Sequence, residues 1–428
     1  MDYDRPFGHP VPPPEAGGRD RQGMDYDLLL SGCCEVARQL LRHGAEIQRA
    51  EDTARRILAA YGLEGDIVAL PHCVWVSAPC PDGRIRTVMR RVPAIASDIE
   101  GIERFNDLSR RLCAAPPADP GEILALCRET EAGLRRYPAW QCVAGYFVGA
   151  FFFALFFSGG VAEAVAAGLA GLASGVCLTA LGRVGANGFL TTLASAFVLG
   201  GAAYGMGALG APISLEITIA GAIMVLVPGL VFTNFMSDLL TGDMVAGLAT
   251  FARAVLSAGA IALGAGIAMA MFRDAAPAPA GAAAEYGPAL YCVFAFVACL
   301  GFCPAFNAQG VGALLCCLGG MLGWAVYLLA TGLGANIFAA SLIAAMAVSA
   351  WSEWMARRRR CPATSYLLIA MFPLVPGLTI YQAMDYGLRG DTDLFLATFF
   401  RTVGIAGCLA LGLLLVSSAL GLLRRARR

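Results

Sequence analysis

The sequence predicts a membrane all-α protein with ten transmembrane helices, arranged as two inverted five-helix repeats, and an N-terminal cytoplasmic α/β domain. The chain of 428 residues is 58% hydrophobic and 14% charged, whereas soluble proteins are about a quarter charged. Residues 1–140 hold 18 Arg and 21 Asp or Glu, and the remainder holds 13 Arg and 10 Asp or Glu. An apolar stretch with a Pro-Gly pair also occurs twice. These observations predict a soluble start followed by a duplicated membrane part.

The first quarter of the chain predicts a tail and a small soluble domain. Residues 1–25, rich in Pro, Gly and charge, are predicted to be a disordered tail, and residues 26–137 the α/β domain. Apolar residues at helical spacing predict two helices that end at glycines, and a β-branched run followed by an alternating run predicts a β-hairpin. Ser97, with Glu100 at the third helical position, forms a capping box that predicts a third helix. A fourth helix is expected after a Pro-rich linker.

No catalytic residue, metal site or cofactor is predicted. The domain contains no convincing nucleophile–base pair, so the sequence does not indicate an enzyme. The fifteen cysteines form no CxxC pair and lie mostly in apolar segments, which indicates structural thiols. The alternative is a zinc site built from His43, His72, Cys73 and Cys80, although their spacing fits no finger pattern. A formal net charge of zero argues against a nucleic-acid partner.

From Trp140 onward, apolar runs of about twenty residues predict bilayer-spanning helices. The first repeat covers residues 141–271 and the second 287–422, joined by an Ala/Pro-rich linker at 272–286 and followed by a basic cytoplasmic tail at 423–428. The expected spans are 141–158, 161–180, 187–206, 213–233, 244–271, 287–306, 311–331, 334–355, 364–383 and 394–422.

The arginines fit ten spans with both termini in the cytoplasm. Arg135 and Arg136 precede the first span, Arg183 follows the second, and the run at 357–360 follows the eighth. Further arginines follow the tenth span. All of these positions are cytoplasmic in the expected topology, as the positive-inside rule requires.

The two Pro-Gly stretches belong to an internal repeat. Aligning 226–253 with 374–401 without a gap gives 14 identities in 28 positions, among them Pro, Gly, Asp and Arg. The triplet "GAN" also occurs twice, at 185–187 and 334–336. A repeat of five spans must be inserted upside down, and inverted repeats are typical of alternating-access transporters. The alternative is that each Pro-Gly pair only kinks a packed helix.

The candidate substrate-binding residues lie at or near these repeated stretches. Proline lacks an N–H and opens the helix, and the polar and charged groups nearby could bind a small polar solute. Two arginines deep in the bilayer could bind a carboxylate; alternatively, they snorkel to headgroups or pair with Glu216 or Glu353. The candidates are Pro228, Gly229, Asn234, Asp238, Arg253, Pro376, Gly377, Gln382, Asp385, Arg401, Asn187 and Asn336.

The stretches "HGAEIQRAEDT", "LVPGLVFTNFMSDLLTGDMVAGLA", "WSEWMARRRRCPAT" and "PLVPGLTIYQAMDYGLRGD", in this order, resemble the bacterial threonine/serine exporter family. The resemblance runs from about residue 28 to 422. It implies a multi-pass inner-membrane exporter of small hydroxy amino acids, driven by the proton-motive force, with the lipid bilayer as its surroundings and no cofactor.

Several alternatives stay open. Related systems split the two halves into separate subunits and are associated with succinate export, so a small dicarboxylate is an alternative substrate. Two alternative functions are a channel and a membrane-tethered sensor whose activity lies in residues 26–137. The protein could also form a homo-oligomer.

Overall fold

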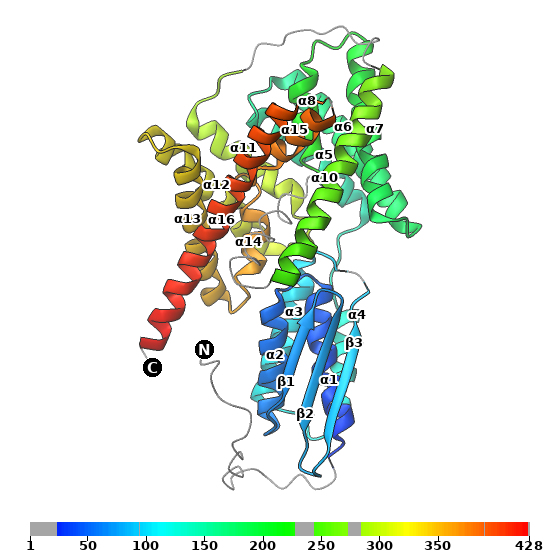
Figure 1. Ribbon diagram of the computed structural model, residues 1–428, viewed down its shortest axis with the longest axis vertical. Coiled ribbons are helices and arrows are strands. Elements are labelled where there is room, and N and C mark those ends of the chain that lie inside the picture. The colour runs from blue at the N-terminus through cyan, green and yellow to red at the C-terminus, as the bar shows by residue number, and fades with distance from the viewer. Residues whose placement is uncertain (1–23, 94, 227–243, 273–283, 389, 427–428) are drawn as a thin grey trace. The chain divides into compact units, whose positions relative to one another are not determined.

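The computed structural model describes residues 24–93, 95–226, 244–272, 284–388 and 390–426 (Figure 1). The chain divides into two compact units. The N-terminal unit comprises Met1–Ile95 and Phe105–Gly133, and the C-terminal unit comprises Ala96–Arg104 and Leu134–Arg428.

The N-terminal unit packs helices against a three-stranded antiparallel sheet of order β1-β2-β3. Helix α1 packs on β2 and β3, and α2 packs on β1. Alternate residues of β2, such as Val74 and Val76, are fully buried in the core. The elements are α1 (Tyr26–Arg42), α2 (Ile47–Ala60), β1 (Asp66–Leu70), β2 (Cys73–Pro79), β3 (Ile85–Arg91), α3 (Ile99–Ala114), whose first turns belong to the C-terminal unit, and α4 (Gly121–Ala132).

Two local expectations are corrected. The run at 66–79 is not one strand of a hairpin, because Pro71 and His72 turn the chain and Leu70 pairs with Cys73. Proline has no N–H for a ladder, so the run divides into β1 and β2. The N-cap of α3 is Asp98, not Ser97, since the Asp98 carboxylate accepts from the Gly101 amide at 3.1 Å.

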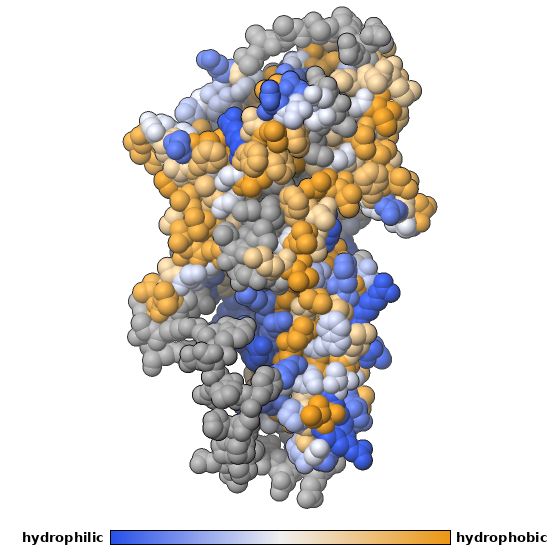
Figure 2. Space-filling view, in the orientation of Figure 1, coloured by the Kyte–Doolittle hydropathy of each residue, from blue (hydrophilic) through white to orange (hydrophobic). Residues whose placement is uncertain are grey.

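The C-terminal unit is entirely helical where it is described. Seven helices of the described residues are long and apolar enough to cross a membrane, and α11 is apolar but shorter. The face drawn in Figure 2 is largely hydrophobic over these helices. The helices are α5 (Ala139–Phe156), α6 (Val161–Arg183), α7 (Gly188–Ala208), α8 (Leu215–Ile223), α10 (Met244–Phe272), α11 (Pro288–Phe302), α12 (Gly310–Gly332), α13 (Ile337–Arg359), α14 (Thr364–Ala370), α15 (Gly377–Leu388) and α16 (Thr392–Ala426).

The expected ninth span is interrupted at its Pro-Gly pair. Helix α14 ends at Ala370, the chain turns through 371–376, and α15 begins at Gly377. Pro373 and Pro376 cannot donate hydrogen bonds to the preceding turn, which explains the interruption. The matching pair Pro228-Gly229 lies outside the described residues.

Four helices of the first half of the C-terminal unit recur in the second half at one offset. Helices α5 to α8 each begin 149 residues before α11 to α14, at 139 and 288, 161 and 310, 188 and 337, and 215 and 364. The connecting turns repeat as well. Ser158 and Asn307, also 149 residues apart, have positive φ angles of 64° and 50°. The backbone therefore follows the duplication that the sequence contains.

Equivalent helices α5 and α11 pack against each other in opposite directions. Cys142, at the start of α5, donates from Sγ to the carbonyl oxygen of Pro304, just after the end of α11, at 3.5 Å. At the other end, Ser158 Oγ lies 2.8 Å from Tyr291 Oη near the start of α11. Between them the helices approach closely, because a Cβ on Gly145 would clash with the Gly301 carbonyl.

The halves also exchange equivalent hydrogen bonds. Tyr137, just before α5, donates its hydroxyl to the Ala308 carbonyl in the second half at 3.1 Å. Tyr286, just before α11, donates to the Gly159 carbonyl in the first half at 2.8 Å. Both the tyrosines and the carbonyls are 149 residues apart. Reciprocal contacts of this kind arise where equivalent parts meet across a two-fold axis.

Candidate functional site

Polar groups gather at the interruption between α14 and α15. The Thr379 hydroxyl donates to the Pro376 carbonyl oxygen at 2.9 Å. The Thr402 hydroxyl, from α16, lies 2.8 Å from the Thr379 hydroxyl, and Thr402 is only 1% exposed. Two hydroxyls and the interrupted backbone thus form a partly buried polar group between α15 and α16. Non-helical backbone at membrane depth is tolerated where protein buries it or a wet cavity borders it.

This interruption lies against a helix of the first half. Ala254 and Ala258 of α10 form one buried cluster with Ile380 of α15 and Ala406 of α16. Gln382 is half-buried, one turn beyond Thr379 on α15. The side chain of Asp385 lies outside the described residues, as do the first-half candidates Pro228, Gly229, Asn234 and Asp238. Among the described candidates, Pro376 immediately precedes α15, and Gly377 and Gln382 lie on it.

Arg253 and Arg401 occupy matching places on α10 and α16. Each lies nine residues after the first residue of its helix, at 244 and 392, or roughly 14 Å along the axis at 1.5 Å per residue. Both are exposed, and neither has a hydrogen bond or ion pair with a described residue. A guanidinium at such a depth in hydrocarbon requires a partner or water. Within the described residues, the two sequence-predicted arginines thus occupy matching and exposed positions on α10 and α16.

An aromatic pair on α12 borders Arg401. The Arg401 charge lies close enough to the Tyr327 phenol to interact with it. Tyr327 stacks on Trp324 with ring centroids 4.8 Å apart. The indole Nε1 of Trp324 is buried without a hydrogen-bond partner among the described residues. Glu353, considered above as a partner for an arginine, lies 3.8 Å from Arg357.

The two "GAN" asparagines are helix caps. Asn187 Oδ1 accepts from the Phe189 amide at 2.8 Å, and Asn336 Oδ1 accepts from the Ala339 amide at 2.9 Å. Both side chains are exposed at the starts of α7 and α13. These contacts satisfy amides that a helix start leaves unpaired. The structure gives these two candidates a capping role.

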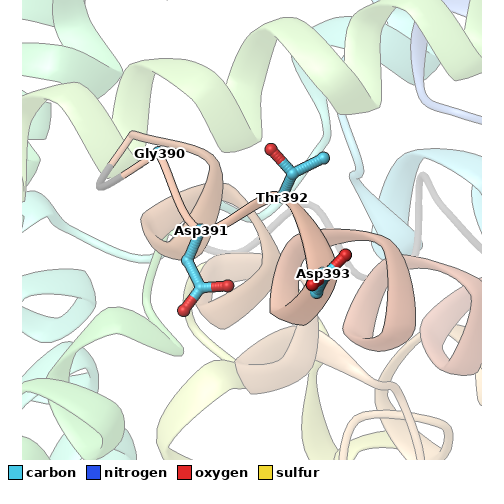
Figure 3. A pocket seen from close by; sticks show the side chains of 4 residues that line it. All are labelled: Gly390, Asp391, Thr392 and Asp393. Atoms are coloured by element: carbon cyan, nitrogen blue, oxygen red, sulfur yellow. The ribbon is translucent and has the colours of Figure 1, made fainter.

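An open pocket of about 500 Å³ lies at the turn between α15 and α16, lined by Gly390, Asp391, Thr392 and Asp393 (Figure 3). Asp391 caps α16 by accepting from the Leu394 amide at 3.2 Å. In Figure 3 the side chains of Asp391 and Thr392 point in opposite directions. All of its described lining residues belong to one turn and their side chains do not converge, so the described residues do not assign the pocket a binding role.

Sequence reasoning missed Thr379, Thr402, Trp324 and Tyr327. A signal existed for Thr379, because a hydroxyl three residues after a proline can satisfy the carbonyl that the proline leaves free. No local signal distinguishes Thr402, since its partner lies on another helix.

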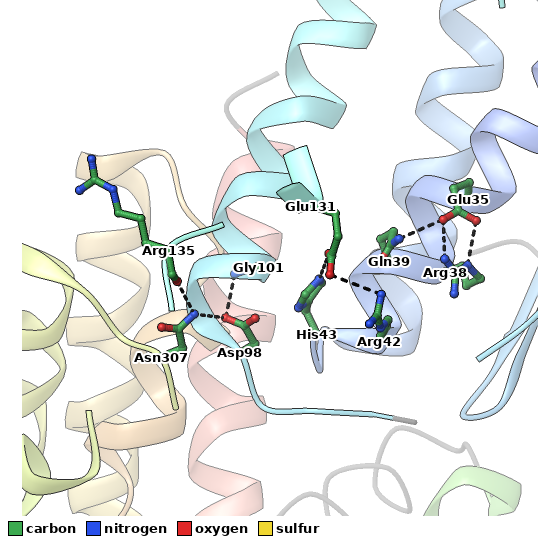
Figure 4. A network of polar contacts seen from close by, with 10 residues as sticks. All are labelled: Glu35, Arg38, Gln39, Arg42, His43, Asp98, Gly101, Glu131, Arg135 and Asn307. Carbon is green, nitrogen blue, oxygen red and sulfur yellow. Dashed lines mark hydrogen bonds and ion pairs between the residues drawn. The ribbon is translucent and has the colours of Figure 1, made fainter. Parts of the chain in front are cut away.

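The N-terminal unit has a separate polar network around Glu131 (Figure 4). His43 Nε2 lies 3.0 Å from Glu131 Oε2, and Arg42 lies 3.4 Å from the other carboxylate oxygen. The His43 ring also stacks on Phe105 at 5.5 Å. Burial raises the pKa of the Cys127 thiol to about 12, which makes it a poor metal ligand. Within the described ranges, no three His, Cys, Asp or Glu side chains come together to hold a metal.

These features define a class: a multi-pass α-helical membrane protein with an interrupted helix and polar groups inside its membrane unit. Residues 31–272 match the family model described as a putative threonine/serine exporter. Residues 291–419 match a second model, described as a threonine/serine exporter. The first match alone covers more than half of the chain, so this protein belongs to the threonine/serine exporter family, with both parts fused in one chain. No solved structure matches the chain.

Proposed function

We propose that this membrane exporter carries threonine and serine out of the cell by alternating access of two inverted five-helix repeats, driven by the proton-motive force. The observation that carries the proposal is the reciprocal pair of tyrosine contacts at Ala308 and Gly159. The antiparallel packing of α5 and α11 supports inversion, because equivalent helices of parallel repeats would run in the same direction. Inverted repeats place the substrate near the membrane midplane at interrupted helices.

The substrate site is proposed between α10, α15 and α16. Arg401 and Arg253 bind the carboxylate, since a guanidinium matches it with two hydrogen bonds. Thr379 and Thr402 lie beside the interruption and bind the substrate's hydroxyl group. In the sequence repeat, Asn234 and Asp238 with Gln382 and Asp385 are the remaining polar candidates. Rocking of one repeat against the other exposes this site to each side in turn.

The proposed location is the bacterial inner membrane, with both termini in the cytoplasm. Reporter fusions after residues 160, 208, 280 and 389 are expected to read outside, and fusions after 183 and 359 inside. A cytoplasmic reading at 280 would contradict the proposal, because the halves would then be parallel.

Uptake into everted vesicles tests the activity. Labelled threonine and serine should accumulate with saturable kinetics, and collapse of the proton gradient should abolish accumulation. Flux that does not saturate and ignores the gradient would indicate a channel. Two arginines also suit two carboxylates, so succinate belongs in the same panel, and its preferential uptake would favour the dicarboxylate alternative. A chain lacking residues 1–137 should retain part of the flux. Complete loss of function in this variant, with the membrane part intact, would favour a sensor.

A further inference from the structure

One side of α13 is exposed from the middle of the helix to its last turn. Between residues 343 and 358, the exposed positions follow one another at intervals of three or four or lie next to each other, which places them on a single face of the helix. These positions are Ile343, Met346, Ala350, Trp354, Arg357 and Arg358. The opposite side packs on α16, because a Cβ on Gly412 would lie 2.8 Å from that of Ala345.

The order of side chains along this face matches the layers of a bilayer. Helix α13 is among the helices long and apolar enough to cross a membrane. Its exposed face is apolar from Ile343 to Ala350, then carries the Trp354 ring, which is 49% exposed, and ends in two arginines. Tryptophan is enriched at the level of the lipid headgroups, and arginine reaches the phosphates beyond it. The face therefore fits the length of a phospholipid from acyl chain to headgroup.

The Trp354 ring holds one of the two guanidinium groups. The Cζ atom of Arg358 lies 5.4 Å from the centroid of that ring, a cation–π contact. The ring is itself supported by Trp351, whose ring centroid lies 5.6 Å away and whose Nε1 donates to the Leu315 carbonyl of α12 at 3.0 Å. A guanidinium that stacks on a ring keeps the N–H groups at its edge available to an acceptor.

The second guanidinium, that of Arg357, is only weakly paired. It lies 3.8 Å from the Glu353 carboxylate, which is too long for a hydrogen bond, and 47% of its side chain is exposed. Arg359 differs from both, because it donates to the Tyr366 hydroxyl of α14 at 3.2 Å. Arg357 and Arg358 thus give the end of the exposed face a net positive charge.

The internal repeat shows that a helix end at this place does not itself require these residues. Subtracting the offset of 149 from Trp354, Arg357 and Arg358 gives the equivalent positions on α7 and just after it. These positions hold Gly205, Ala208 and Leu209. The first half therefore has neither the ring nor the charges, although its helix ends in the same way.

We propose that the exposed face of α13 binds one anionic phospholipid, with its phosphate on Arg357 and Arg358 and its acyl chain along the apolar residues from Ile343 to Ala350. A phosphate suits guanidinium groups because it accepts two parallel hydrogen bonds from each. A zwitterionic headgroup brings an ammonium group that the two arginines repel, so the face selects a headgroup without one. This inference goes beyond the proposed transport function, since lipid binding needs no substrate.

Competition for a labelled lipid tests the proposal. The purified full chain, in a non-ionic detergent, is loaded with fluorescent phosphatidylglycerol and then titrated with unlabelled competitors. Phosphatidylglycerol should displace the probe, and phosphatidylcholine with the same acyl chains should require a concentration about tenfold higher or more. Inorganic phosphate should not displace it, because it has no acyl chain. Equal displacement by phosphatidylcholine, or displacement by inorganic phosphate alone, would overturn the inference.

Removal of the two charges tests the assigned residues. The double variant Arg357→Gln with Arg358→Gln should bind phosphatidylglycerol about tenfold more weakly or worse, since each arginine at a headgroup contributes roughly fivefold. Arg183→Gln is the matched control, because Arg183 is an exposed arginine in the last turn of α6. Wild-type affinity in the double variant, or an equal loss in the control, would overturn the inference.

A change at the ring tests the same site with every charge kept. Trp354→Leu should weaken phosphatidylglycerol binding by about two- to fivefold, because Arg358 loses the ring that holds it. Trp140→Leu is its control, since Trp140 is a tryptophan on the first turn of α5, 68% exposed. Trp354→Leu keeps the positive charges that orient a membrane protein, so it still decides the question if the double glutamine variant does not fold. Unchanged affinity in Trp354→Leu would overturn the assignment of the lipid to this face.

Discussion

The two halves of the C-terminal unit agree in backbone and differ in how their first loops are held. In the first half, Glu163 ties the starts of α6 and α8 with its own carboxylate. In the second half, the equivalent position is Gly312, which has no side chain, and Asn307 donates to Asp98 at the start of α3. Ser158, the counterpart of Asn307, bonds instead to Tyr291. A duplicated backbone therefore keeps its turns while its loops acquire different partners.

The difference suggests different tasks for the two loops. The first loop is held by residues at the ends of the membrane helices themselves. The second is held by α3, whose later residues belong to the N-terminal unit. The two equivalent loops therefore differ in which part of the chain holds them.

The largest effect is expected from closing the helix interruption. Replacing Pro376 and Gly377 together by alanine restores the backbone N–H at position 376 and raises the helix propensity of both positions. Helices α14 and α15 should then join into one helix. Threonine export should fall by about tenfold or more, because the opened backbone of the proposed site is lost. Initial rates in everted vesicles measure this, with the protein quantified by immunoblot.

Pro288→Ala is the control for that variant, since Pro288 occupies the first turn of α11, where a missing N–H costs nothing. The same double substitution at Pro228 and Gly229 extends the comparison to the first half. Normal export by either double variant at normal abundance would reduce that Pro-Gly pair to a packing kink.

The next effect concerns the paired arginines. Arg401→Gln and Arg253→Gln should each raise the apparent KM for threonine several-fold, because a carboxylate loses its charged partner, by about 1–2 kcal/mol. Lysine at each position should restore part of the affinity but not the two-point geometry. Uptake measured over a range of threonine concentrations gives the apparent KM of each variant. If both glutamine variants transport normally, the guanidiniums serve lipid headgroups.

Part of this architecture was predictable from local signals. Proline and glycine predicted the interruption at Pro376, and the "GAN" triplets predicted the repeat, because backbone-determining residues survive duplication. The apolar runs located the long helices, although α11 ends at Phe302, four residues before its expected end at 306. The apolar run at 66–79 predicts one strand, but Pro71 interrupts it, and the structure has two paired strands, β1 and β2.

What the sequence did not reveal depends on contacts between distant segments. Nothing near Asp98 indicates Asn307, since a side chain's environment follows from packing. Asn187 and Asn336 illustrate a second limit: the repeated polar residue predicts a substrate ligand, while the structure shows that each side chain caps its own helix. Repetition alone does not distinguish function from backbone geometry.

A smaller effect should follow from breaking the exchanged tyrosine contacts. Tyr137→Phe leaves the buried Ala308 carbonyl without its donor, and Tyr286→Phe does the same to Gly159. Each should lower the free energy of unfolding by about 1–2 kcal/mol. Denaturant unfolding in detergent measures both. Equal losses are expected from equivalent contacts, and a loss confined to one tyrosine would weaken the two-fold relation.

The smallest effect is expected at the capping asparagines. Asn187→Ala and Asn336→Ala each remove one side-chain acceptor from an exposed helix start, which should cost about 0.5–1 kcal/mol of stability. The apparent KM for threonine should not change, because both side chains already accept from their own helix. Asparagine to aspartate is the control, since it keeps the acceptor and adds charge that suits a helix N-terminus. A raised apparent KM with unchanged stability would indicate that these asparagines contact the substrate. A raised KM in only one of the two alanine variants would indicate that the two halves bind substrate unequally.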